Sequence, residues 1–169
     1  MTYTQAYNRV SKWNGWMGQE DCKVLWEEAE KVEGTILEIG GYAGISTVIM
    51  ALASPKSKVV VIDPFLKDIP SNIYPEFLEH IKGLNIKHIR EKSEDALWTK
   101  KVDLIHVDGD HRFRVVQNDI ERYTRYLKKG AHMLIHDYAN DPELFGVNKA
   151  VNESGFKFDL VSGFARICG

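Results

Sequence analysis

Short apolar runs alternate with amphipathic stretches through most of this 169-residue chain, and this alternation restricts the fold more than any other feature. The apolar runs are TILEIG, KVVVID, NIKHIR, VDLIHVD and AHMLIHD. Such runs are typical of parallel strands that are buried on both faces. Between the last two runs, the clearest helical stripe consists of Phe113, Val116, Ile120, Tyr123 and Leu127. The pattern predicts a doubly wound α/β domain whose mostly parallel sheet carries helices on both faces.

The two ends of the chain complete this arrangement. Residues 1–34 are expected to form an N-terminal helical segment, and residues 35–169 the α/β core. Asp141 as N-cap, followed by Pro142, predicts the start of the last helix. The segments FKFDL and FARIC then predict a C-terminal antiparallel hairpin. With 44% hydrophobic residues, the chain has the length of one domain.

Charge and cysteine content argue against several classes of protein. Lys and Arg number 22 and Asp and Glu 24, giving a formal net charge of -2 without a basic block. This balance argues against a nucleic-acid partner and favours small neutral or polar ligands. No apolar run approaches the ~18 residues of a membrane span, and Cys22 and Cys168 lie at opposite ends of the chain. We therefore expect a soluble, cytoplasmic protein with no membrane partner.

A glycine turn follows the first predicted strand. Glu38, Gly40 and Gly44 form the pattern E-x-G-x-x-x-G, which differs from the dinucleotide pattern G-x-G-x-x-G. Glycines without a Cβ let the backbone approach a ligand, and the carboxylate can accept a hydrogen bond from an ammonium group. The alternative is a tight strand-to-helix turn with a solvated Glu.

Polar residues also close the second and third predicted strands. Asp63 ends KVVVID, where a carboxylate can accept both hydroxyls of a ribose. The alternative is that Asp63 and Pro64 only start a turn. Ser93 and Glu94 follow the third strand, where they could meet an adenine edge or cap a short helix over SEDALW.

The stretch HVDGDHRF closes the fourth predicted strand with two acids and two histidines within six positions. Because side chains alternate along a strand, His106 and Asp108 point to the same side, with Asp108 at the carboxyl end of the strand and His106 buried one layer below. Gly109 permits a turn through which Asp108 and His111 can face the same space. The stretch is a candidate metal site or catalytic base, whereas the simpler interpretation is that Asp110 and His111 cap the next helix.

Together these motifs resemble class I S-adenosylmethionine-dependent methyltransferases. LEIGGYAGISTVIMA is similar to the first motif of the catechol-type O-methyltransferases. VDLIHVDGDHRFRVVQNDIERYTRYLKKGAHMLIHDY is similar to the subgroup that contains antibiotic and sugar O-methyltransferases. The resemblance covers roughly Trp16 to Tyr138 and implies the class I methyltransferase-like Rossmann fold.

The resemblance also implies roles for individual residues. Those expected to bind S-adenosylmethionine are Glu38, Gly40, Tyr42, Gly44, Ser46, Asp63, Ser93, Glu94 and Asp108. Of these, Glu38, Tyr42 and Ser46 would serve the methionine end, Asp63 the ribose, and Ser93 and Glu94 the adenine. His111 would be the catalytic base, with Asp108 as a second catalytic residue. Asp108, His136 and Asp137 would be the ligands of a divalent metal.

Two departures from the family affect these expectations. His136 stands where metal-dependent relatives usually carry Asp or Glu, and Mg²⁺ prefers oxygen ligands. Mn²⁺ would tolerate the mixed set better, or His136 could bind substrate without a metal. Only about thirty residues precede the first strand, so aromatic side chains within residues 1–16 could form a flap over the site or pack on the sheet edge. The exposed edge of the hairpin also leads us to expect a homo-oligomer.

The chemistry of methyl transfer fits these residues. The acceptor oxygen must be aligned with an electrophilic methyl group, and a histidine with a pKa near ~6.5 can remove its proton. The implied reaction is O-methylation of a small-molecule or sugar hydroxyl, with or without a metal. Phenols and N-methylation stay open. The alternatives are a non-catalytic cofactor-binding module and a metallo-hydrolase, whose pattern H-x-H-x-D-H resembles H-x-D-x-D-H but needs a two-sheet sandwich with further histidines.

Overall fold

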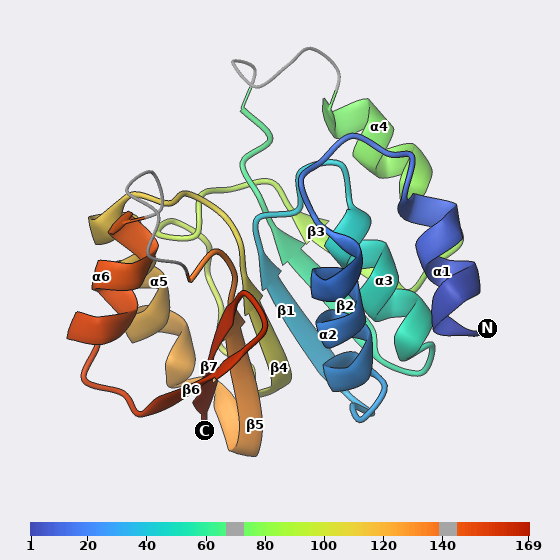
Figure 1. The fold of residues 1–169 in the computed structure, drawn as a ribbon. Coiled ribbons are helices and arrows are strands. Elements are labelled where there is room, and N and C mark those ends of the chain that lie inside the picture. The colour runs from blue at the N-terminus through green and yellow to red at the C-terminus, as the bar shows by residue number, and fades with distance from the viewer. Residues whose placement is uncertain (67–72, 139–144) are drawn as a thin grey trace.

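The computed structural model of the chain describes residues 1–66, 73–138 and 145–169. Within these residues, one sheet of seven strands has the order β3-β2-β1-β4-β5-β7-β6 (Figure 1). The strands are β1 (Thr35–Ile39), β2 (Lys58–Ile62), β3 (Ile86–Ile89), β4 (Val102–Val107), β5 (Leu127–Ile135), β6 (Phe158–Val161) and β7 (Phe164–Cys168). The helices are α1 (Tyr3–Val10), α2 (Gln19–Ala29), α3 (Ile45–Ala53), α4 (Ile73–His80), α5 (Phe113–Thr124) and α6 (Phe145–Glu153). The doubly wound fold predicted from the sequence is confirmed.

The strand pairing places the carboxyl ends of the central strands together. β3, β2, β1, β4 and β5 pair in parallel, whereas β7 is antiparallel to both β5 and β6. The antiparallel pair at the C-terminus is therefore also confirmed. β1 lies between β2 and β4, so the strand order reverses beside it, and a crevice forms at such a point in open α/β sheets.

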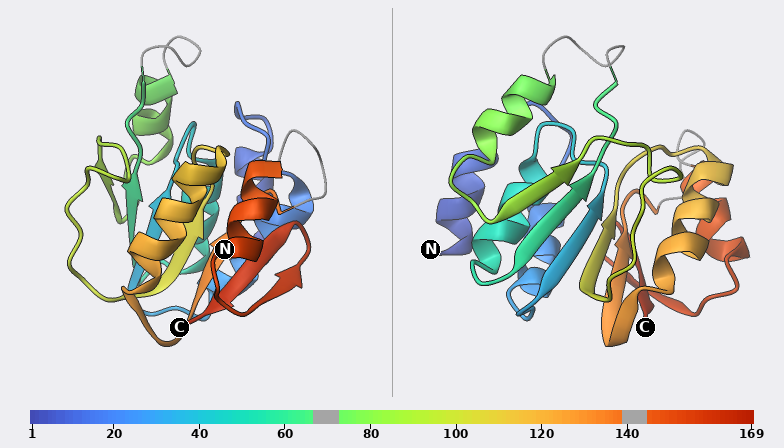
Figure 2. Two further views of the ribbon diagram at one scale, coloured as in Figure 1. Left: turned by 90° about the vertical axis from the view of Figure 1, so that its left-hand side faces the viewer. Right: turned by 180° about the vertical axis from the view of Figure 1, so that it is seen from behind.

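Two apolar clusters cover the two faces of the sheet. One joins alternate residues of β1 and β2, such as Ile36 and Val59, to α1, α2, α3 and α4. The other joins the intervening residues, such as Leu37 and Val60, to α5 and α6. Figure 2 shows the same division, with α5 and α6 on the side away from α1–α4. Burial on both faces explains why these strands are apolar at successive positions.

Some local predictions differ from the structure. The segment SEDALW forms a turn at residues 93–95 and no helix, and Trp98 donates its indole N–H to the carbonyl of Lys100. The fifth strand begins at Leu127 instead of Ala131. Asp141 and Pro142 lie outside the described residues, so the predicted start of the last helix cannot be compared with the structure. Among the described helices, none combines the length and apolar character needed to cross a bilayer.

Candidate active site

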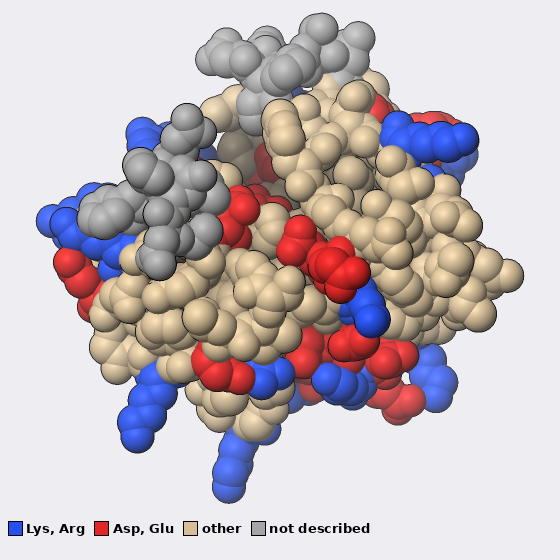
Figure 3. Space-filling model, in the orientation of Figure 1, with Lys and Arg blue, Asp and Glu red and all other residues tan. Residues whose placement is uncertain are grey.

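A cavity of about 700 Å³ opens at the carboxyl ends of the central strands. Acidic side chains gather in the middle of the face seen in Figure 3, and most Lys and Arg side chains lie nearer its margin. The predicted site residues that line the cavity are Gly40, Tyr42, Gly44, Ser46, Asp63, Ser93, Glu94, Asp108, His111, His136 and Asp137. Of the predicted set, Glu38 alone does not line it. The fold thus brings residues that follow all five parallel strands to one space.

The glycine turn after β1 lies directly against the loop after β4. A Cβ on Gly40, whose φ is +89°, would lie 2.2 Å from the carbonyl oxygen of Asp108, so no other residue fits without a shift. Asp63 at the end of β2 fixes the same turn, because its carboxylate accepts the backbone N–H groups of Gly41 (2.8 Å) and Tyr42 (3.1 Å). Asp63 therefore organises the turn as well as lining the cavity.

Glu38 lies behind this turn and is fully buried. The hydroxyl of Thr47 on α3 donates to one carboxylate oxygen, and Nδ1 of His106 on β4 lies 3.0 Å from the other. Both oxygens have partners within the protein. Glu38 ties β1 to α3 and β4 beneath the cavity, and His106 occupies the buried layer that strand parity predicted.

Two aspartates and two histidines meet at the ends of β4 and β5. Nε2 of His111 lies 3.1 Å from Oδ2 of Asp137 and 3.7 Å from Oδ1 of Asp108. Nδ1 of His136 lies 3.3 Å from Oδ1 of Asp108 and 3.4 Å from Oδ2 of Asp137. One donor atom each from Asp108, His111 and Asp137 lies within 4.8 Å of the others, a spacing suited to a metal ion. The geometric set thus contains His111 where the sequence suggested His136.

Within HVDGDHRF, Asp110 and His111 have different surroundings. Asp110 does cap the loop, since it accepts the backbone N–H of Arg112 at 2.8 Å. His111 instead turns towards the carboxylates of the cavity. A Cβ on Gly146 of α6 would lie 2.2 Å from the carbonyl oxygen of His111, so α6 packs closely against this loop. His111 is held in the cluster from both sides.

A family model described as a methyltransferase domain matches residues 37–138. The chain belongs to this methyltransferase family. An uncharacterized protein of Acanthamoeba polyphaga mimivirus is 28% identical to it over 159 residues, which cover 83% of this chain and 72% of that protein. The metallo-hydrolase alternative is wrong, because the methyltransferase has one mostly parallel sheet among its described residues in place of a two-sheet sandwich.

Two solved structures share the fold of the methyltransferase. The O-methyltransferase from Bacillus cereus, in complex with S-adenosylhomocysteine, has a TM-score of 0.71 and 16% identity, covering 99% of this chain and 89% of that one. A TDP-rhamnose 3'-O-methyltransferase of calicheamicin biosynthesis has a TM-score of 0.66 and 17% identity, covering 98% of this chain and 80% of that one. Both likenesses extend over nearly the whole chain.

The pKa values of the four groups in this cluster of the methyltransferase are strongly shifted. Burial acts to raise the pKa of Asp108, but hydrogen bonds with His111 and His136 outweigh it and hold that pKa well below its usual range. Hydrogen bonds with the same two histidines lower the pKa of Asp137. In return, contacts with Asp108 and Asp137 raise the pKa of His111 to about 9. Burial opposes a rise at His136, yet the two carboxylates raise its pKa to about 10.

A third carboxylate reaches the cluster from outside the predicted motifs. Oδ2 of Asp21, in the first turn of α2, lies 3.6 Å from Nε2 of His136. Asp21 belongs to none of the motifs described above, and nothing in its local pattern indicated that α2 would lie beside β5. His136 is consequently enclosed by Asp21, Asp108 and Asp137.

The N-terminal aromatic residues divide between two roles. Trp13 stacks on His80 of α4 at 3.6 Å between ring centroids, and Tyr3 packs edge-on against Trp26. These rings thus pack against α2 and α4. Trp16 is 84% exposed, lines the mouth of the cavity and lies 5.2 Å from the ring of Tyr42.

Proposed function

We propose that the methyltransferase transfers a methyl group from S-adenosylmethionine to a hydroxyl oxygen of a neutral small molecule or sugar. The proposal depends on one observation: a single cavity is lined by the Gly40 turn with Asp63 and by the cluster of Asp108, His111 and Asp137. Family membership supports methyl transfer. The likeness to a sugar O-methyltransferase supports a hydroxyl acceptor, and the acidic surroundings disfavour an anionic one.

The described residues fit the cofactor. The missing Cβ of Gly40 leaves the turn open to a close backbone approach, and Asp63 has acceptor capacity beside the N–H groups that it already binds. Asp63 would accept the ribose hydroxyls. Tyr42 and Ser46 would flank the methionine end, and Ser93 and Glu94 the adenine. Glu38 would act through the turn that it supports.

His111 would remove the proton of the acceptor. When bound, S-adenosylmethionine supplies an electrophilic methyl group on a sulfonium sulfur, so the C–S bond breaks as the new O–C bond forms. The hydroxyl proton would pass to Nδ1 of the neutral form of His111, because Nε2 faces Asp137 at 3.1 Å, and since the carboxylates raise the pKa of His111 to about 9, this form increases as the pH rises. Asp137 would stabilise the imidazolium that results. The products are a methyl ether and S-adenosylhomocysteine.

The donor set also fits a divalent cation. Asp108 and Asp137 would hold it with an imidazole, and two carboxylates with two imidazoles suit Mn²⁺ better than Mg²⁺. Bound there, the cation would polarise the acceptor oxygen and offset the negative charges that raise the pKa of His111.

The test combines binding with turnover. Calorimetry should detect binding of S-adenosylhomocysteine to the purified protein. Transfer of a radiolabelled methyl group should then be measured on sugars, glycosides and catechols, with the anionic nucleotide sugars, amines and RNA as the contrasting panel. Labelled methyl ethers from the first panel would support the proposal. Binding without transfer to any acceptor would instead indicate a non-catalytic module, and absence of binding would reject the proposal altogether.

A further inference from the structure

A buried carboxylate on α5 also lines the cavity, although the reaction above does not use it. Asp119 is 1% exposed, and its Oδ1 has no hydrogen-bond partner among the residues that the structure describes. An unpaired buried carboxylate oxygen reduces folding stability. Buried polar groups without a hydrogen-bond partner concentrate at functional sites, so Asp119 is a candidate for contact with a ligand.

Asp119 lies on the side of α5 that lines the cavity, next to the loop that contains Ser93. Arg112, Val115 and Asp119 follow the helical spacing of three and four residues, and all three line the cavity. Ser93 lines it too and is a hydrogen-bonding neighbour of Asp119. One turn further along α5, the hydroxyl of Tyr123 donates to the carbonyl of Ser93 at 2.7 Å. α5 therefore fixes the Ser93 loop and places Asp119 beside it.

The partner that Asp119 lacks is a hydrogen-bond donor. The guanidinium of Arg112 is paired with Asp110 at 2.6 Å, and that of Arg122 donates to the carbonyl of Ala96 at 2.8 Å. Burial raises the pKa of Asp119 to about 6. The carboxyl group is then mostly ionised at neutral pH and can accept a strong hydrogen bond.

The apolar part of the cavity lining indicates which kind of ligand carries the hydrogen-bond donor. Val115 lies one turn before Asp119 on α5, and Ile62 and Leu66 line other parts of the same cavity. A flat heterocycle with apolar faces and a donating group on its rim suits such a wall. The adenine ring has these properties, since its exocyclic amino group donates and its ring nitrogens accept.

We infer that Asp119 accepts a hydrogen bond from the exocyclic amino group of adenine and makes the cofactor site selective for adenine over hypoxanthine. The inference rests on the proposed function, because it assumes that S-adenosylmethionine occupies the cavity. Hypoxanthine carries a carbonyl oxygen in place of the amino group, and a buried carboxylate repels that oxygen. Asp119 is thus a specificity-determining residue of the cofactor site.

Calorimetric titration of S-adenosylhomocysteine and its deaminated analogue, S-inosylhomocysteine, tests this inference. The wild type should bind the adenosyl compound at least about 30-fold more tightly. Asp119→Asn can accept from an amino group or donate to a carbonyl. It should therefore weaken adenosyl binding by about 5-fold, tighten inosyl binding, and bring the two Kd values within about 3-fold of each other.

Two further variants separate recognition from structure. Glu121→Gln removes the same charge from an exposed position of α5 and should leave both Kd values unchanged. Tyr123→Phe removes the hydrogen bond to the Ser93 loop and should raise the Kd values of both compounds by the same factor. A purine preference in Asp119→Asn equal to that of the wild type would overturn the inference alone. Failure of the wild type to bind either compound would overturn the proposed function with it.

Discussion

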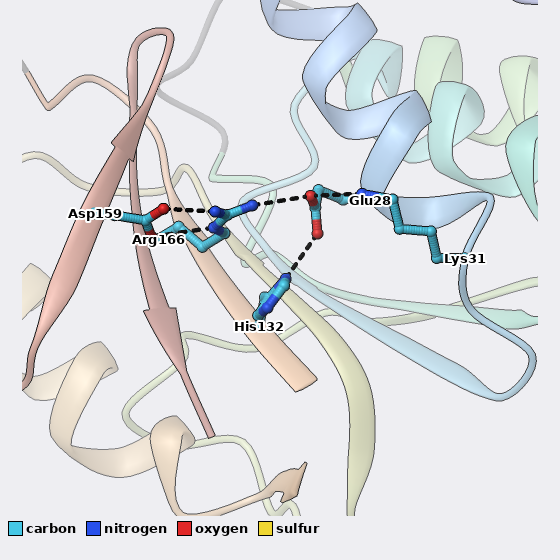
Figure 4. Close-up of polar contacts among 5 residues, drawn as sticks. All are labelled: Glu28, Lys31, His132, Asp159 and Arg166. Carbon is cyan, nitrogen blue, oxygen red and sulfur yellow. Dashed lines mark hydrogen bonds and ion pairs between the residues drawn. The ribbon is translucent and has the colours of Figure 1, made fainter. Parts of the chain in front are cut away.

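Two clusters in the methyltransferase bring carboxylates against histidines, and they differ in what balances the carboxylate charge. Around Glu28 of α2, His132 of β5 lies at 2.7 Å, Lys31 at 3.0 Å and Arg166 of β7 at 3.2 Å, and Arg166 is also paired with Asp159 of β6 (Figure 4). Glu28 is 6% exposed and has two permanent cations beside it. This cluster is complete within the protein and ties α2 to the antiparallel end of the sheet.

The cluster at the cavity is balanced differently. Among the described residues, the ion pairs of Asp108 and Asp137 are with histidines alone, and Asp21 adds a third carboxylate. The carboxylates raise the pKa of His111 to about 9 and that of His136 to about 10, so these histidines can release a proton once a bound cation offsets the carboxylate charge, whereas Lys and Arg keep theirs. The cavity cluster can therefore accept a metal cation without breaking an ion pair to Lys or Arg. The comparison predicts that changes at the cavity alter turnover and changes around Glu28 alter stability.

The largest expected effect is that of His111→Ala on turnover. Loss of the base should lower kcat by ~10²–10⁴ and leave the affinity for S-adenosylhomocysteine nearly unchanged. Methyl-transfer assays with EDTA and with added Mn²⁺ check this. Asp108→Ala should make the residual activity insensitive to both additions, because the variant lacks a cation ligand. Full activity of folded His111→Ala would end the assignment of His111 as base.

Glu28→Gln should produce the largest loss of stability. Removing the buried charge leaves His132 without its carboxylate partner and Arg166 with Asp159 alone, at a cost of about 2–3 kcal/mol in unfolding free energy, less than for a fully buried pair because His132 and Arg166 are partly exposed. Urea unfolding measures this, and kcat of the folded variant should equal that of the wild type. A stable variant with reduced kcat would remove the distinction between the clusters.

The same variant has a defined pH dependence. Burial acts to raise the pKa of Glu28, but the hydrogen bonds from His132 and Lys31 outweigh it and lower that pKa in the folded state. The stabilisation is therefore present above the unfolded pKa and is lost as the pH falls through the folded one. The difference in unfolding free energy between wild type and Glu28→Gln should shrink below about pH 4.5.

Asp119→Asn should change stability in the opposite direction. Burial raises the folded pKa of Asp119 to about 6 from 3.8, so folding favours the protonated group, and stability declines as the pH rises through this range. Without ligand, the variant should exceed the wild type by about 1–2 kcal/mol at pH 8 and by less at pH 5. A variant that is less stable at both pH values would indicate that Asp119 serves only to hold the Ser93 loop.

The sequence indicated the cavity because polar residues that follow buried parallel strands must meet at one edge of the sheet. This rule alone was enough to predict that Asp63, Asp108 and Asp137 line the cavity. The direction of Glu38 could not be predicted in the same way. Its side chain lies beneath the turn because Thr47 and His106 bind it there, and His106 is 68 residues away in the sequence.

Contacts between distant elements account for what the sequence did not reveal. Asp21 reaches His136 only because α2 packs beside the end of β5, and a helix start carries no signal of that neighbour. The failed helix at SEDALW shows the reverse case, where a local capping pattern was overridden. Tyr123 and Arg122 of α5 bind the carbonyl oxygens of Ser93 and Ala96, which then cannot serve helical hydrogen bonds as readily.

The smallest effect is expected at the cavity mouth, where Trp16 and Trp13 provide a matched pair. Trp16 is 84% exposed, so Trp16→Ala should cost little stability, whereas Trp13→Ala removes the stack on His80 and should lower the melting temperature. If Trp16 and Tyr42 form a wall for the acceptor, Trp16→Ala should raise KM for the acceptor by about 5-fold, or ~1 kcal/mol, with unchanged affinity for S-adenosylhomocysteine. Equal KM values in the two variants would mean that the mouth recognises its acceptor through the polar cluster, and that the exposed ring has no part in the choice.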